Sequence, residues 1–241
     1  MRPLTLVLTL VLTLGCNSLG GKPVAMTGRV LIGPDAEAEA VANPTLTVRD
    51  GESEIFAEAT GDADGNFEID VPAGAFFTVT SSGEGYVPTS ISGQAAAGPF
   101  EAGDGNVWAM ADQQYAGIFD DFSGCANVDE PGGVIYGQVR LWTGSADDET
   151  VYTVNTANAT AYGQNDTQID ACYLDNDGGD SGLATSTGAT GYFSIFGLPE
   201  GASTMVLTYT VFGESVDPYY FPVWVPEDGV APLLPAYVEA N

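Results

Sequence analysis

The chain has 241 residues, of which 44% are apolar, and this is enough to build hydrophobic cores in one or two domains. Asp and Glu number 33 against 5 Lys and Arg, and the resulting formal net charge of -28 repels nucleic acid, so we exclude nucleic-acid partners. The chain has no His, which removes the commonest general base, zinc ligand and partner of a nucleophile.

Residues 1–15 have the pattern of an export signal, with Arg2 followed by an apolar run too short to span a bilayer as a mature helix. The sequence Leu-Thr-Leu-Gly-Cys that ends at Cys16 resembles the lipobox of bacterial lipoproteins, although Thr13 and the bulky Leu14 depart from it. The resemblance implies lipidation of Cys16, with residues 16–23 as a tether to the outer membrane or cell surface. An ordinary secretory signal with an incidental cysteine is the alternative.

Residues 24–110 show the alternating pattern of an antiparallel β domain. Its centre is the sequence GDADGNFEIDVPAG at residues 61–74, in which a polar turn precedes Phe67, Ile69 and Val71 on one face of a strand. We expect strands at residues 24–32, 45–49, 55–59, 67–71, 76–80, 86–88 and 107–110. Pro88 places its strand at a sheet edge. Short strands separated by turns are typical of a sandwich or barrel.

Several pieces of this half resemble the carboxypeptidase regulatory-like domain, over residues 28–91. They are Gly28-Arg29-Val30, residues 45–48, 60–67 and 71–74, and Gly85-Tyr86. The resemblance implies a transthyretin-like β-sandwich that is accessory and carries no catalytic residues. The zinc peptidase domain that gives the family its name is not in the chain, because its metal site needs His.

Residues 111–132 are expected to form one short helix and a linker. Tyr115, Ile118 and Phe122 follow helical spacing, with Asp112 as a plausible cap and Gly124 as a stop, and we expect the helix to span residues 111–123 and to pack between two domains.

Residues 133–241 repeat the first pattern. The sequence GATGYFSIFGLPEG at residues 188–201 places Gly191 and Phe193 where residues 61–74 have Gly65 and Phe67. Further strands are expected at residues 134–142, 151–154, 158–162, 205–212 and 219–225, the last at a sheet edge because it contains Pro222. We therefore predict an all-β fold of two antiparallel, transthyretin- or Ig-like β-sandwich domains with one short connecting helix.

The remaining cysteines, Cys125 and Cys172, are an even pair in an exported chain, and they predict one disulfide. This bridge would attach an insertion in the second half to the connecting helix. Two free buried thiols are the alternative.

Two groups of residues are candidate binding sites. Asp175, Asp177 and Asp180 place carboxylates at alternate positions around glycines, which is compatible with weak calcium binding or with a solvated turn. No other cofactor is expected. Asp62, Asp64 and Asn66 look similar, but Asp and Asn commonly stabilise turns through their own backbone.

Trp224, Tyr219 and Tyr220, with Trp142, form a possible sugar-stacking platform, and packing at a sheet edge is the alternative. The sequence thus favours a non-catalytic, lipid-anchored envelope protein that acts as a scaffold, adhesion or partner-binding module for an unknown protein or glycan. The alternatives are a carbohydrate-binding module and a carboxylate-based hydrolase, and no pattern places two carboxylates together for the latter.

Overall fold

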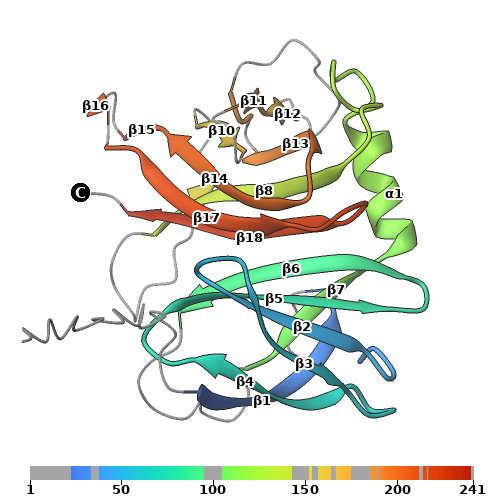
Figure 1. The fold of residues 1–241 in the computed structure, drawn as a ribbon. Coiled ribbons are helices and arrows are strands. Elements are labelled where there is room, and N and C mark those ends of the chain that lie inside the picture. The colour runs from blue at the N-terminus through green and yellow to red at the C-terminus, as the bar shows by residue number, and fades with distance from the viewer. Residues whose placement is uncertain are drawn as a thin grey trace, which may run out of the picture.

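The computed structural model describes residues 23–33, 38–94, 105–142, 152–153, 157–163, 167–174, 186–188, 190–211, 214–215 and 217–239. These residues form a mostly β molecule with one short helix (Figure 1). The signal segment, Cys16, and the candidate calcium ligands Asp175, Asp177 and Asp180 lie outside the described residues. Within the described part of the chain, no helix is long and apolar enough to cross a membrane.

The described residues of the first half form seven strands. They are β1 (Pro23–Ile32), β2 (Thr45–Asp50), β3 (Ile55–Thr60), β4 (Asn66–Pro72), β5 (Phe76–Gly83), β6 (Tyr86–Gln94) and β7 (Val107–Ala111). β1 lies between antiparallel β4 and parallel β7, and β2, β5 and β6 continue from β3 in the order β3-β2-β5-β6. β6 also pairs antiparallel with β7, which joins the two groups of strands.

The second half repeats these pairings except that between β6 and β7, and it has additional short strands. They are β8 (Gly133–Trp142), β9 (Tyr152–Thr153), β10 (Asn158–Tyr162), β11 (Gln168–Asp170), β12 (Cys172–Tyr173), β13 (Tyr192–Leu198), β14 (Gly201–Thr208), β15 (Thr210–Val211), β16 (Glu214–Ser215), β17 (Tyr219–Val225) and β18 (Val230–Glu239). β8 lies between antiparallel β13 and parallel β18, and a separate sheet has the order β11-β10-β14-β17. The strands that correspond to β1, β2, β3, β4, β5, β6 and β7 are therefore, in the same order, β8, β10, β11, β13, β14, β17 and β18.

The register of the strands repeats as well. Gly28 on β1 is paired with Phe67 on β4, and Gly137 on β8 is paired with Phe193 on β13. Phe193 is fully buried, and an added Cβ on Gly137 would overlap its ring. The glycine in the second half is therefore needed because the phenylalanine ring occupies the space beside its Cα.

The turn before each phenylalanine is held by equivalent hydrogen bonds. The N–H of Val30 donates to the carbonyl oxygen of Gly65 at 3.0 Å, and the N–H of Val139 donates to that of Gly191 at 2.9 Å. Both glycines have φ near +75°, at 77° and 72°, a conformation that other residues rarely adopt. The glycines at equivalent places in the two sequence patterns thus perform the same conformational role.

Each half has its own hydrophobic cluster, and a third cluster connects them. The first contains Phe67 and Val48, the second contains Phe193 and Leu207, and the third contains Phe122. The third cluster draws residues from β7, from the helix and from β8, β13 and β18. Burial of apolar surface is the main stabilising term in each cluster.

The helix α1 (Asp112–Asp121) lies along one side of the molecule and reaches both halves (Figure 1). Its N-cap is Ala111 rather than Asp112, because the Gln114 Oε1 accepts a hydrogen bond from the Ala111 N–H at 3.2 Å. Asp112 lies instead in the first turn, where its negative charge interacts favourably with the partial positive charge of the helix N-terminus. Phe122, at the C-terminal end, is fully buried and contacts Phe196 edge-on at 5.9 Å.

The predicted disulfide between Cys125 and Cys172 is present. Cys125 follows the helix and Cys172 begins β12, a short strand added to the edge of β13. The bridge therefore attaches the insertion of the second half to the connecting helix, as the sequence suggested.

The two halves are in direct contact through β6 and β18, where Thr89 pairs with Val230 in a parallel bridge. The prediction that Pro88 marks a sheet edge was wrong, since β6 has β5, β7 and β18 as neighbours. The register between β5 and β6 shifts at this point, between Ser81 and Gly83, so that no paired position requires an N–H from Pro88. The matching prediction for Pro222 is correct, because β17 is the edge of its four-stranded sheet.

Candidate binding site between the two halves

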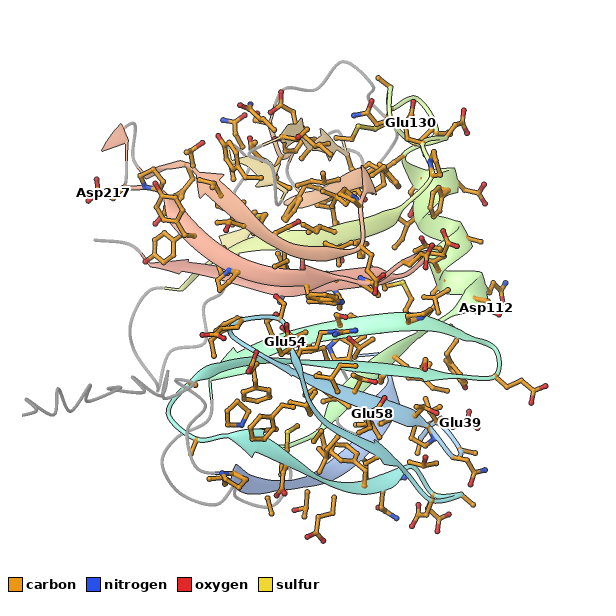
Figure 2. All side chains as sticks on the ribbon, in the orientation of Figure 1. Glu39, Glu54, Glu58, Asp112, Glu130 and Asp217 are labelled. Atoms are coloured by element: carbon orange, nitrogen blue, oxygen red, sulfur yellow. A yellow bond between two sulfur atoms is a disulfide. The ribbon has the colours of Figure 1, made fainter. Side chains whose placement is uncertain are left out.

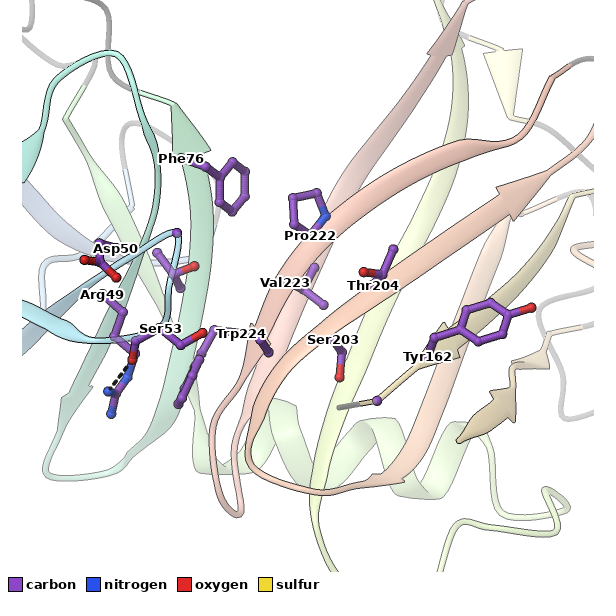
Figure 3. A pocket seen from close by; sticks show the side chains of 14 residues that line it. Arg49, Asp50, Ser53, Phe76, Tyr162, Ser203, Thr204, Pro222, Val223 and Trp224 are labelled. Carbon is purple, nitrogen blue, oxygen red and sulfur yellow. Dashed lines mark hydrogen bonds between the residues drawn. The ribbon is translucent and has the colours of Figure 1, made fainter. Parts of the chain in front are cut away.

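A cavity of about 400 Å³ lies where the two halves meet beside β17 (Figure 3). Its volume is within the range of about 300–1,000 Å³ that is typical of small-molecule sites. The first half contributes Arg49, Asp50, Gly51, Ser53, Phe76 and Thr78, and the second half contributes Tyr162, Gly163, Ala202, Ser203, Thr204, Pro222, Val223 and Trp224.

The first wall is built from the end of β2 and the β2–β3 turn. One carboxylate oxygen of Asp50 accepts hydrogen bonds from the N–H groups of Glu52 at 3.0 Å and Glu54 at 3.1 Å. The turn also holds Ser53 at a φ of 70°. These bonds fix the turn beside Arg49. They also engage one oxygen of the Asp50 carboxylate, which is adjacent to Arg49 in the sequence.

The second wall is the outer face of the sheet that contains β10, β14 and β17. Side chains alternate along β17, so that Tyr220, Pro222 and Trp224 point away from the core of the second half. Across the ladders, Trp224 pairs with Ala202, and Thr204 pairs with both Pro222 and Tyr162. This face therefore presents aromatic rings beside hydroxyl groups.

Arg49 and Trp224 join the two walls. The guanidinium carbon of Arg49 lies 4.2 Å from the centroid of the Trp224 ring, which is a close cation–π contact. The Nη1 of Arg49 donates to the carbonyl oxygen of Ser53 at 3.3 Å (Figure 3). The Nε of Arg49 is buried and has no hydrogen-bond acceptor in the described part of the chain. A buried donor on a charged group is costly when it has no partner.

The Arg49 guanidinium is a rare cation on this molecule, and it lines the cavity together with the Asp50 carboxylate. Three of the five basic residues, Arg29, Arg49 and Arg140, lie in the described ranges. Arg29 donates to the carbonyl oxygen of Asp64, and the Nε of Arg140 donates to the Gln138 Oε1 at 2.8 Å, both away from the cavity. Arg49 is the one basic side chain among the described residues that line it.

Acidic side chains are distributed over the outside of the molecule. Figure 2 shows labelled examples on both halves, and all six are exposed: Glu39, Glu54, Glu58, Asp112, Glu130 and Asp217. A surface of this kind repels anionic molecules in general, and screening limits the repulsion to about 8 Å at physiological salt. The charges that act inside the cavity are therefore mainly those of Arg49 and Asp50, which line it, rather than those of the distant acids.

A smaller cavity of about 240 Å³ shares the Arg49–Trp224 pair with the first. Its other lining residues include Pro88 of the first half and Glu200, Pro226 and Glu227 of the second. The arginine and the tryptophan thus line both hollows, and the larger hollow has more hydroxyl and aromatic side chains around it.

The predicted sugar platform is only partly assembled. Trp224 lines the cavity, and Tyr220 lies on the same face of β17 and is 65% exposed. Tyr219 is on the opposite face, where it packs against the core of the second half with its ring stacked on Phe221 at 6.3 Å. The three rings therefore share no single surface. The side chain of Trp142 is outside the described part.

Sequence reasoning missed Arg49, which is the residue that connects the two walls. The available signal was the small number of cations, but it does not single out Arg49, because Arg29 and Arg140 also lie within strands. Its neighbours Ser53, Phe76 and Tyr162 come from three separate segments, and no local pattern brings these together.

The polar turn at Asp62 is a structural element, as predicted. Its Oδ1 accepts from the N–H of Asp64 and the N–H of Asn66, each at 2.9 Å. The Asn66 side chain also donates to this carboxylate, and these hydrogen bonds lower the pKa of Asp62. In the described ranges, this turn included, no three Asp, Glu, Cys or His side chains are close enough to hold a metal ion.

No protein-family model matches the chain, and no curated protein matches it. The resemblance to the carboxypeptidase regulatory-like domain therefore stays a prediction.

Solved structures show only distant similarity. The Bacillus anthracis TIE protein is 13% identical with a TM-score of 0.29, over 88% of this chain and 33% of its own. GBS52, the minor pilin of Streptococcus agalactiae, is 11% identical with a TM-score of 0.31, over 90% of this chain and 94% of its own. The shaft pilin SpaA of Lactobacillus rhamnosus GG is 12% identical with a TM-score of 0.26, over 88% and 96%. At these values no family relationship follows.

Proposed function

We propose that the chain is an exported, lipid-anchored scaffold of the cell surface that binds a partner without catalysing a reaction. In this proposal residues 1–15 are removed, Cys16 carries the lipid, and two transthyretin-like sandwiches at residues 24–110 and 133–241 hold a binding site between them. The observation that carries the proposal is the duplicated strand pairing, because two equivalent halves joined by a shared core make a spacer with a fixed inter-domain cleft.

The junction supports a rigid scaffold. The halves meet through the β6–β18 bridge, the third hydrophobic cluster and the Arg49–Trp224 contact, which lie at different places along the interface. Three separate attachments oppose rotation of one half against the other more effectively than a single linker does.

The disulfide supports export. Disulfides persist in oxidising compartments and are rare in the reducing cytosol. The Cys125–Cys172 bridge closes a long loop, and we propose that it forms after the chain has crossed the inner membrane.

The chemistry of the cavity supports binding rather than catalysis. The described residues that line it provide one carboxylate, that of Asp50, which is already bonded to the turn. Hydroxyl groups there have no His or Lys neighbour among the lining residues to activate them as nucleophiles.

The test of location uses intact bacterial cells that express the wild-type chain or the Cys16→Ala variant. We expect the wild-type protein in the membrane fraction, with an acyl mass on its N-terminal peptide and digestion by protease added outside the cells. The Cys16→Ala variant should be released from the membrane with its disulfide intact. Recovery of wild-type protein from the cytosol with two titratable thiols would contradict the proposal.

A further inference from the structure

We propose that the cavity between the two halves binds an acidic saccharide, with a carboxylate of the ligand against Arg49 and a sugar ring beside the aromatic side chains. This inference depends on the proposed binding function and names its ligand class.

Arg49 provides the anion contact. Its Nη1 is held by the Ser53 carbonyl, which leaves Nε and Nη2 on the opposite edge of the guanidinium plane. Nε has no acceptor in the described residues, and this edge is one that carboxylates bind with two parallel hydrogen bonds. A ligand carboxylate would therefore satisfy a buried donor that the protein itself leaves without a partner.

The rest of the cavity suits a saccharide. Hydroxyl groups of Ser53, Thr78, Ser203 and Thr204 line it, and they can donate or accept hydrogen bonds with sugar hydroxyls. Rings of Phe76, Tyr162 and Trp224 supply apolar faces of the kind against which the C–H side of a sugar packs. The Thr78 hydroxyl is already hydrogen-bonded to that of Ser92 at 3.1 Å. A purely apolar ligand would offer no partner to the hydroxyl groups of Ser53, Ser203 and Thr204, and a metal ion would find only one lining carboxylate.

The net charge of the protein favours an acidic ligand over a neutral one at this site. Arg49 is one of few cations on a molecule with a formal net charge of -28, and one oxygen of the neighbouring Asp50 carboxylate is engaged by the N–H groups of Glu52 and Glu54, so the favourable contact for an anionic group in this cavity is the guanidinium. A neutral saccharide can accept hydrogen bonds from the guanidinium through its hydroxyl oxygens, but it cannot form the charge-assisted pair that a carboxylate forms. The Arg49–Trp224 stacking also holds the guanidinium in place before the ligand arrives.

The test titrates the mature protein with a uronic-acid disaccharide, digalacturonate, and with the neutral disaccharide galactobiose, and follows binding by calorimetry and by tryptophan fluorescence. We expect saturable binding of digalacturonate that weakens as salt is raised, and binding of galactobiose that is weaker by about tenfold or more. The wild-type comparison needs no variant, so it remains decisive if a substitution impairs folding.

Three variants separate the roles of the residues. Arg49→Gln should weaken digalacturonate binding by about tenfold or more, and Arg49→Lys should restore only part of it because an ammonium lacks the planar fork. Trp224→Phe should keep binding but reduce the fluorescence change. The matched control Arg29→Gln removes a cation far from the cavity and should bind like the wild type.

Equal affinity for the two disaccharides, no saturable binding of either, or an equal loss in Arg29→Gln would each overturn the inference. These outcomes leave the surface scaffold standing, because that role is tested separately by lipidation and protease accessibility on cells.

Discussion

Gly229 tests how closely the two halves pack. It precedes β18, and an added Cβ would overlap the carbonyl oxygen of Pro88 and lie 2.7 Å from the Pro226 Cγ and 3.0 Å from the Pro88 Cβ. Carbon atoms pack at about 3.5–4.0 Å, so the neighbours must move by about 1 Å. The backbone of Pro88 belongs to β6, which is held by β5 and β7, and the proline rings have little freedom to rotate away.

We therefore expect Gly229→Ala to lower the free energy of unfolding by about 2–3 kcal/mol, in the upper part of the range for an overpacked site. For a chain of this size each kcal/mol lowers the melting temperature by about 2–4 °C. Urea unfolding followed by circular dichroism measures the first quantity, and a thermal scan measures the second.

Gly117→Ala is the matched control, because an added Cβ on this helical glycine meets no atom within 4 Å. It should be neutral or stabilise by up to about 1 kcal/mol through helix propensity. If Gly229→Ala costs less than about 0.5 kcal/mol, or no more than the control, the close approach of β6 and β18 is refuted, together with the fixed cleft that depends on it.

Further predictions concern the cores, the disulfide and the tyrosines. Phe67→Ala and Phe193→Ala remove buried rings at equivalent places, and each should cost about 3–5 kcal/mol in urea unfolding; a loss in one half alone would contradict their equivalence. Replacing Cys125 and Cys172 together by Ser should cost about 4 kcal/mol from the loop entropy of a 47-residue separation, and an unchanged unfolding midpoint would refute this. Burial raises the pKa of Tyr173 to about 12, with the nearby Asp170 charge adding to the effect and a hydrogen bond to Ala159 opposing it, while burial and the Asp228 charge raise that of Tyr115 to about 12. Because the unfolded chain loses these protons near pH 10, stability is full below pH 10 and falls as the pH rises towards 12, which unfolding midpoints and phenolate absorbance will show; stability that is constant across this interval would contradict it.

The repeating part of the fold could be predicted from the sequence because it is local. Phe67 and Phe193 lie on buried faces of their strands, as the alternation of apolar residues in the sequence indicates. The turn before each strand needs a residue with positive φ, and the sequence has a glycine there. The helix was predictable for the same reason, because the spacing of its apolar residues can be seen within one short segment of the sequence.

The junction could not be predicted in the same way. Pro88 suggests an edge strand, but a register shift lets β6 lie inside a sheet, and such shifts depend on partners distant in sequence. The cavity has the same character: Arg49 and Trp224 are far apart along the chain, and only the packing of one half on the other brings them to 4.2 Å. Tyr219 and Tyr220 are adjacent in sequence, yet the pleat of β17 sends them to opposite faces.

The disulfide has a mechanical consequence when the chain is pulled from its ends. Between Cys125 and Cys172 lie β8, β9, β10 and β11, and when the chain is stretched the tension crosses directly from one sulfur to the other. The enclosed backbone carries no load and cannot be drawn out, which withholds roughly 160 Å of extension at about 3.5 Å per residue over the 47-residue separation. A reducing agent would thus lengthen the fully stretched molecule, whereas under oxidising conditions the central strand of the second half is shielded from the pull.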